Sequence, residues 1–407
     1  MMKRTVALFL LVSLFAIGFL FPPDSSGEET MKIGIIAAQS AALSRLPADV
    51  LDGFRLGADK INSGHGVQGM RIVPVTRAAK AGLGSGLATA QALVAEDKVD
   101  ILVASTDRAN ALVLADFAAQ VKIPLFVAFS ERPVTGGRDG NRYVFTMSES
   151  PRMAGAAAAV MLHEKPYEHY WIAGDDDDYG HALADALWGA LKKLEPTFVL
   201  VGQSWWKAGE RDFAPYIAQI ISTKPDFVVV ATGPSNIARF QRAAKAAGLA
   251  GKIPFYQHWA NEHSILAEQG NDAVEGVYGT ASYLFYNPST PANKAFSDEF
   301  RKTFHRYPGS GAFYGYMTAR FIAEGFRKAG KVDREKLISA LEGMSLESPV
   351  GHVAIRPCDH QLELPIFLSL TGKNPAYPDF LTSVSLQSLG AKYYMPGCEE
   401  GPKTGKR

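Results

Sequence analysis

Polar side chains that suit carboxylate binding follow a short apolar run in the first third of the chain. Ser105, Thr106 and Arg108 come after the apolar residues 99–103 and at the start of a predicted helix. Main-chain N–H groups at a helix start attract anions, and hydroxyl and guanidinium groups donate to them as well. The pattern predicts a carboxylate site; a helix start capped by Asp107 is the alternative interpretation.

A second polar loop follows the apolar residues 124–128. Ser130 is the expected polar contact in this loop. Arg132 suits a carboxylate because a guanidinium binds it through two parallel hydrogen bonds. A solvated surface arginine is the alternative interpretation of Arg132.

Four consecutive aspartates, residues 175–178, resemble ligands for a hard cation at first sight. Consecutive side chains diverge, however, and the spacing of an EF-hand loop is absent. Acidic residues also suit the N-terminus of the helix predicted to follow. We therefore expect no metal ion at this position.

Common catalytic patterns are missing from the sequence. It contains no G-x-S-x-G, H-E-x-x-H or P-loop string, and its nine His are scattered without ligand spacing. We therefore expect neither enzymatic activity nor a cofactor. The net charge of +1 gives no electrostatic reason to expect nucleic acid or an anionic membrane as a partner.

Alternating apolar runs and amphipathic segments must position these residues. Non-alternating apolar runs predict buried parallel strands at 32–37, 70–75, 99–103, 124–128, 170–173, 197–202, 226–231 and 253–256. Helical patterns lie between them at 48–62, 87–96, 109–120, 152–162, 179–194, 213–221 and 235–247. The pattern restarts near residue 150, and 407 residues are too many for one core, so we expect two α/β lobes.

After residue 290 helices dominate, with short strands near the end. Helices are predicted at 293–304, 313–329 and 334–341, and strands at 350–355 and 364–370. The economical path returns the chain to the first lobe and crosses back near residue 350.

Both ends of the chain carry information about its compartment. Lys3 and Arg4 precede the apolar run 5–21 and a polar exit, which is the layout of a secretory signal; an uncleaved anchor is the alternative. In an oxidising compartment the two cysteines, Cys358 and Cys398, favour one disulfide over two free thiols.

Five local strings, in order and at matching spacings, resemble type I periplasmic binding proteins of the leucine/isoleucine/valine-binding branch. They are the helix-to-turn segment 57–69 (GADKINSGHGVQG), Asp178-Tyr179-Gly180, the AGERDF segment 208–213, Pro225-Asp226-Phe227 and Asp359-His360-Gln361. The resemblance covers residues 32–370. It implies two doubly wound parallel-sheet lobes, joined by three crossovers, that close on a small ligand by a hinge.

Further site residues are implied by this resemblance. Tyr179 matches an aromatic residue that covers the ligand from the second lobe, and Gly233 lies in the next loop of that lobe. In amino-acid-binding relatives a carboxylate near Trp259 pairs with the ligand ammonium. Its replacement by Trp259 predicts a ligand without an amine, unless the alignment slips or Asp107 or Glu149 supplies the acid. His258 is either a ligand contact or a packed strand-end residue.

Together these features predict a periplasmic solute-binding protein of an ATP-driven importer. The expected layout is a signal peptide at 1–27, a first lobe from 31–148 and 278–347, and a second lobe from 149–277 and 348–407. We expect a monomer that captures a small carboxylate-bearing ligand and docks on ABC permease subunits. A ligand-sensing receptor that signals to a partner is the alternative.

Overall fold

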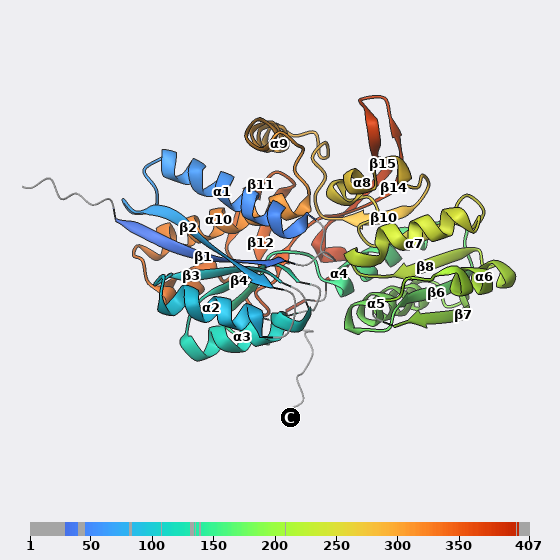
Figure 1. The fold of residues 1–407 in the computed structure, drawn as a ribbon, viewed down its shortest axis with the longest axis horizontal. Helices are drawn as coiled ribbons and strands as arrows, with labels where there is room; N and C mark the ends of the chain where they lie inside the picture. The colour runs from blue at the N-terminus through green and yellow to red at the C-terminus, as the bar shows by residue number, and fades with distance from the viewer. Residues whose placement is uncertain are drawn as a thin grey trace, which may run out of the picture.

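The computed structural model describes residues 29–39, 45–80, 84–106, 108–130, 134, 136–137, 140–207, 209–395 and 397–398. The predicted signal segment, residues 1–27, lies outside the described residues. Figure 1 shows two α/β lobes side by side along the longest axis of the molecule. Across the part of the chain that the structure describes, no helix combines the length and apolar character needed to cross a bilayer.

The first lobe is built on a five-stranded sheet. Its strands are β1 (Thr30–Gln39), β2 (Arg71–Lys80), β3 (Ile101–Thr106), β4 (Leu125–Ser130) and β5 (Val144–Thr146). Their order is β2-β1-β3-β4-β5, and all neighbours pair in parallel. β3 is buried along its whole length, which explains why it reads as an unbroken apolar run.

Helices from two distant parts of the sequence cover this sheet. The N-terminal part supplies α1 (Leu46–Ser63), α2 (Ser85–Ala95) and α3 (Arg108–Val121). The chain later returns with α9 (Pro291–Phe304), α10 (Ser310–Ala329) and α11 (Arg334–Leu341). Helices α1 and α10 pack closely, because Gly53 and Gly315 bring the two backbones together where a Cβ atom would clash.

The second lobe is built on a seven-stranded mixed sheet. Its parallel strands are β6 (His169–Asp175), β7 (Val199–Trp206), β8 (Phe227–Ala231), β9 (Phe255–Gln257) and β10 (Tyr278–Ala281). The antiparallel hairpin β14 (Ile366–Asn374) and β15 (Tyr377–Leu389) extends it to the order β15-β14-β10-β9-β8-β6-β7. Figure 1 shows this hairpin projecting from the body of the lobe.

Helices on both faces complete the second lobe. They are α4 (Pro151–Leu162), α5 (Asp178–Leu194), α6 (Ala214–Thr223), α7 (Pro234–Ala246) and α8 (His263–Gln269), with short 3-10 turns at Gly270–Asp272 and Ala391–Tyr393. Two separate hydrophobic clusters include alternate residues of β8: Val229 lies in one, whereas Val228 and Val230 lie in the other. The predicted fold class, two α/β lobes, is confirmed; the first sheet is parallel as predicted, and the second is mixed because β14 and β15 pair antiparallel.

The last crossing between the lobes lies between residues 363 and 366, whereas we predicted it near residue 350. A small sheet of β11 (Ser345–Ser348), β12 (Gly351–Ile355) and β13 (Leu362–Glu363) contributes Val353, Ile355 and Leu362 to the core of the first lobe. The chain enters the seven-stranded sheet only at Ile366 of β14. Within the described residues, the crossovers therefore follow β5, β10 and β13.

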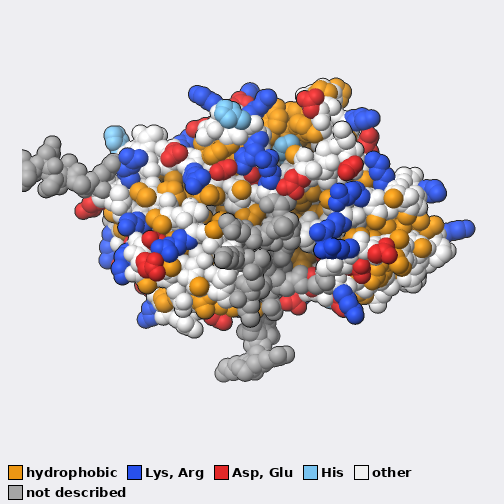
Figure 2. Space-filling model, in the orientation of Figure 1, with side chains coloured by type: hydrophobic (Ala, Val, Ile, Leu, Met, Phe, Trp, Pro, Cys, Tyr) orange, Lys and Arg blue, Asp and Glu red, His pale blue; other side chains and the backbone are white. Residues whose placement is uncertain are grey.

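The surface carries charges of both signs. Figure 2 shows Lys and Arg side chains interspersed with Asp and Glu over the visible face of both lobes. This mixture agrees with the net charge of +1 over the full sequence.

Candidate ligand-binding cleft

The carboxyl ends of β3 and β4 bring three predicted site residues together. Thr106 and Ser130 are register partners, and Ser105 lies opposite Phe129. Ser105 and Thr106 are buried, and Ser105 Oγ has no hydrogen-bond partner among the described residues. Ligands of open α/β sheets bind beyond the carboxyl ends of the strands, so this edge is a suitable anion site.

Helix α3 begins directly beside these hydroxyls. Its first residue is Arg108, and its N-terminal N–H groups add a partial positive charge to the edge. The side chain of Arg108 and the whole of Asp107 and Arg132 lie outside the described residues. Their predicted contacts stay predictions.

In the second lobe, Tyr179 and His258 form a buried pair. Tyr179 lies in the first turn of α5, and His258 follows β9. The Tyr179 hydroxyl lies 2.6 Å from Nδ1 of His258, and both side chains are almost fully buried. The predicted site residues Tyr179 and His258 are thus parts of one unit.

Asp175 fixes the loop that contains Gly233. Its carboxylate accepts hydrogen bonds from Trp206 Nε1 at 2.7 Å, Gly233 N at 2.9 Å and Asn236 Nδ2 at 2.6 Å. Burial raises the pKa of Asp175, although these hydrogen bonds lower it in part. The Gly233 N–H is therefore engaged within the protein, and the first aspartate of the run 175–178 positions a loop.

Trp259 lies at the contact between the lobes in an unusual backbone conformation. Its φ of 67° is left-handed, which costs a bulky residue roughly 1–2 kcal/mol. Its backbone N–H donates to Thr280 O at 2.9 Å, and its ring centroid lies 5.0 Å from that of Phe129 in the first lobe.

The contact between Trp259 and Phe129 belongs to a small apolar cluster that spans the boundary between the two lobes. Besides these two residues it contains Leu46 of α1, Ile237 of α7 and Ile265 of α8. Because side chains from both lobes meet in it, the structure has the two lobes closed on each other. No local pattern indicates this cluster, since its members lie in five separate segments.

Glu149 accepts three hydrogen bonds at the first crossover. Oε1 accepts from Trp259 Nε1 at 2.7 Å, and Oε2 accepts from Ser282 Oγ at 2.7 Å and from the Tyr314 hydroxyl. His258 Nε2 lies 3.6 Å from Oε1, within ion-pair range but too far for a hydrogen bond. We call Glu149, Tyr179, His258, Trp259, Ser282 and Tyr314 the Glu149 network.

The network places two titratable groups, Glu149 and His258, close together in a buried site. Burial by itself would raise the pKa of Glu149, but His258, Tyr314 and Ser282 outweigh it and the pKa is lowered. Burial lowers the pKa of His258 despite the nearby carboxylate. The Tyr179 hydroxyl and Nδ1 of His258 share one hydrogen bond, and the tautomer of the imidazole decides which of the two donates.

Glu262 makes a second carboxylate contact between the lobes. It caps α8, where it accepts from Ile265 N at 3.2 Å and from the Ser264 hydroxyl, and it also accepts from Ser310 N at the start of α10 at 2.7 Å. Burial raises its pKa. Beside it, Asp49 of α1 forms a 2.5 Å ion pair with Arg306, and burial raises the pKa of Asp49 to about 7.

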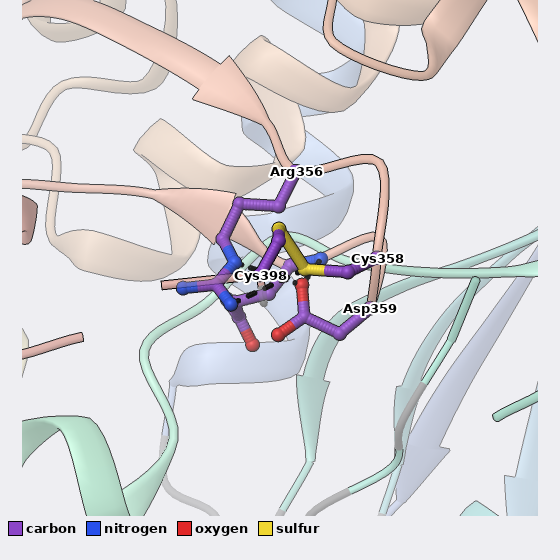
Figure 3. Close-up of a disulfide and its surroundings, with 5 residues drawn as sticks. Arg356, Cys358, Asp359 and Cys398 are labelled. Carbon is purple, nitrogen blue, oxygen red and sulfur yellow. Dashed lines mark hydrogen bonds and ion pairs between the residues drawn. A yellow bond between two sulfur atoms is a disulfide. The ribbon is translucent and has the colours of Figure 1, made fainter. Parts of the chain in front are cut away.

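The structure contains the predicted disulfide between Cys358 and Cys398. The Cα atoms are 5.5 Å apart, and Figure 3 shows Arg356 and Asp359 beside the bridge. Arg356 Nε lies 3.1 Å from Asp359 Oδ1. Elsewhere in the described ranges, no three His, Cys, Asp or Glu side chains gather in a way that could hold a metal ion.

Comparison with known proteins agrees with this architecture. A family model described as periplasmic binding protein matches residues 30–370. The leucine-, isoleucine-, valine-, threonine-, and alanine-binding protein of Pseudomonas aeruginosa is 24% identical over 356 residues, which cover 87% of this chain and 92% of that protein.

Solved structures extend the likeness to the whole fold. A solute binding protein of an ABC transporter from Rhodopseudomonas palustris BisB5, in complex with 3,4-dihydroxybenzoic acid, superposes with a TM-score of 0.79 at 21% identity, covering 89% of this chain and 98% of that one. The closed conformation of a leucine-, isoleucine-, valine-, threonine-, and alanine-binding protein from Brucella ovis gives 0.79 at 17% identity, with coverages of 91% and 97%. Since the family model spans most of the sequence, the chain belongs to the periplasmic binding protein family.

Proposed function

We propose that this protein is an exported receptor of an ATP-driven importer that captures a small carboxylic acid lacking an amine. One observation carries the choice of ligand. The buried carboxylates at the facing ends of the lobes, Glu149, Asp175 and Glu262, all accept hydrogen bonds from protein donors. An ammonium group brought into the cleft would have to compete with those donors.

The proposed ligand carboxylate binds at the first lobe. Ser105, Thr106, Ser130 and the N-terminus of α3 would donate to it, with Arg108 and Arg132 as further cationic contacts. The unpartnered and buried Ser105 Oγ supports this placement, because a buried hydroxyl normally has a partner.

The proposed apolar body of the ligand lies against aromatic side chains. Tyr179 and Trp259 of the second lobe would cover it, and Phe129 faces Trp259 across the cleft. Gly233 and His258 complete the predicted lining. The relative from Rhodopseudomonas palustris holds an aromatic acid, whereas the one from Pseudomonas aeruginosa is named for leucine, isoleucine, valine, threonine and alanine. Both an aromatic and an aliphatic ligand body are therefore tested.

A thermal-shift screen tests this proposal with matched ligands. Leucine is compared with 4-methylpentanoate, which is leucine without its amine, and with benzoate and 3,4-dihydroxybenzoate. A ligand that binds only the folded state adds about 2.7 kcal/mol of stability at a hundredfold excess over Kd. We expect an amine-free acid to raise the melting temperature and leucine to have no effect.

Two other outcomes would contradict the proposal. A shift from leucine alone would show that the cleft needs an amine. No shift from any of the four compounds would refute small carboxylate capture. Small-angle scattering with the bound acid supplies the matching test of closure, because the radius of gyration should fall when the lobes close on it.

A further inference from the structure

Glu149 lies where both lobes and two crossovers meet. It follows β5 at the first crossover and directly precedes Ser150, the N-cap of α4. Ser282 directly follows β10 at the second crossover, Tyr314 lies on α10 of the first lobe, and Trp259 follows β9 of the second lobe. One carboxylate therefore joins four chain segments that belong to two lobes and two crossovers.

The bond to Trp259 connects this junction to the cleft. The indole N–H is 2.7 Å from Oε1 of Glu149, while the indole ring contacts Phe129 across the cleft. The left-handed backbone of Trp259 persists only if the surroundings hold it. Its side chain is held at the N–H by Glu149, and its backbone by Thr280.

His258 connects the same carboxylate to Tyr179. The imidazole has Glu149 on its Nε2 side at 3.6 Å and Tyr179 on its Nδ1 side at 2.6 Å. Trp259 and His258 thus lie directly beside Glu149, and Tyr179 is connected to it through His258. These are the three residues predicted to face the ligand from β9 and α5.

We infer that Glu149 is a positioning residue that orients Trp259 and His258 for the ligand and ties their orientation to the closed hinge. It acts without contacting the ligand, since both of its oxygens are occupied within the protein. The inference deepens the proposed function and rests on it for the identity of the ligand. Its consequence is that the lifetime of the complex depends on a buried residue at the hinge.

Two substitutions at Glu149 separate positioning from charge. Glu149→Gln keeps an oxygen for the Trp259 N–H and offers an amide N–H₂ to the Ser282 and Tyr314 hydroxyls, which can accept. Glu149→Met keeps the length of the side chain but removes the acceptor. Glu335→Met is the matched control, because it makes the same change at a half-exposed glutamate of α11.

Stopped-flow binding of the best acid from the screen is the first measurement. We expect Glu149→Met to raise Kd at least tenfold, mainly through faster dissociation, and Glu149→Gln to stay within about threefold of the unmodified protein. Glu335→Met should leave Kd unchanged. Equal affinities for Glu149→Met and the unmodified protein would overturn the inference.

Fluorescence of Trp259 is the second measurement and needs no ligand. Its contribution is the spectrum of each protein minus that of the same protein carrying Trp259→Phe. We expect a red-shifted Trp259 emission in Glu149→Met and an unchanged one in Glu149→Gln. A lower melting temperature of Glu149→Met with unchanged Trp259 emission would overturn the inference, because a merely structural role predicts that result.

Trp259→Phe tests the same bond from its other end. It keeps an aromatic ring while Glu149 retains Ser282 and Tyr314, so it remains informative if Glu149→Met does not fold. We expect faster dissociation of the acid, and a smaller further loss when Glu149→Met is added than Glu149→Met causes in the unmodified protein, because only the contribution through His258 is left. If no compound in the screen binds, the proposed function fails, and the emission of Trp259 in Glu149→Gln and Glu149→Met still decides the inference.

Discussion

Glu149 and Asp175 are two buried carboxylates that each accept hydrogen bonds from three donors, yet the donors come from different parts of the molecule. The donors of Asp175, which are Trp206, Gly233 and Asn236, all belong to the second lobe. The donors of Glu149 come from both lobes. We infer that a buried charge stabilises a single lobe when all its partners lie in that lobe, and stabilises one arrangement of the two lobes when its partners come from both.

The pKa shifts of these two carboxylates also have opposite directions. Burial outweighs the donors at Asp175 and raises its pKa, whereas His258 together with two hydroxyl groups lowers the pKa of Glu149. The charge on Glu149 is therefore the better compensated one, but only while the lobes stay in the closed arrangement.

Asp175→Ala should have the largest effect of the substitutions that test this contrast. Three buried donors lose a charged acceptor, so we expect the unliganded protein to lose about 4 kcal/mol of stability. Urea denaturation followed by circular dichroism measures the loss. Asp226→Ala is the control, since Asp226 also accepts from three donors but is 43% exposed, and it should cost about 1 kcal/mol. Similar losses for the two variants would refute the burial argument.

A pH titration tests the effect of burial at Asp49, another buried carboxylate. Burial raises its folded-state pKa to about 7 against an attraction from Arg306, and Glu262 of the other lobe adds to the rise. The folded state therefore holds the proton more tightly than the unfolded chain, and stability should rise by roughly 2 kcal/mol as the pH falls from 7 to 5.

Variants of helix α1 isolate this contribution. Asp49→Asn should remove that increase, while Asp59→Asn, at an exposed position of the same helix, should retain it. The measurement is the free energy of unfolding at each pH. An Asp49→Asn protein with the pH dependence of the unmodified chain would show that Asp49 titrates in its ordinary range.

Tyr179→Phe should have the smallest effect, because it removes one hydroxyl at the edge of the Glu149 network. His258 Nδ1 then loses its 2.6 Å partner, and we expect a stability loss of about 1 kcal/mol. Dissociation of the bound acid should accelerate by a factor of about two to five, as read by stopped-flow fluorescence. Tyr167→Phe, which breaks a hydroxyl pair with Tyr278 away from the cleft, should leave dissociation unchanged. Equal effects of the two variants would place Tyr179 outside the network.

The alternating elements could be predicted because local pattern determines them. The segment 226–231 predicts a strand that the structure has at Phe227–Ala231, and 109–120 predicts a helix that it has at Arg108–Val121. Strand β15 (Tyr377–Leu389) was missed, because its partly exposed residues form no apolar run and its pairing depends on β14.

The candidate cleft was only partly predictable. Ser105, Thr106 and Ser130 follow apolar runs, and the structure brings them to one sheet edge. Glu149 lies in a short Ser-Glu-Ser segment without periodicity, and its donors Trp259, Ser282 and Tyr314 are 110, 133 and 165 residues away. No local pattern encodes contacts across such separations. The central position of Glu149 in the network is therefore evident only from the three-dimensional structure.

The disulfide turns the end of the chain into a closed ring. Cys358 lies in a turn held against Gly136 and Gly137 of the first lobe, whereas Tyr394 packs in the core of the second, four residues before Cys398. The ring 358–398 therefore passes from the first lobe to the second through the third crossover and returns through sulfur. A protease that cuts the exposed tip of the β14–β15 hairpin opens the ring without separating the fragments, and only reduction then frees the C-terminal piece from its covalent link.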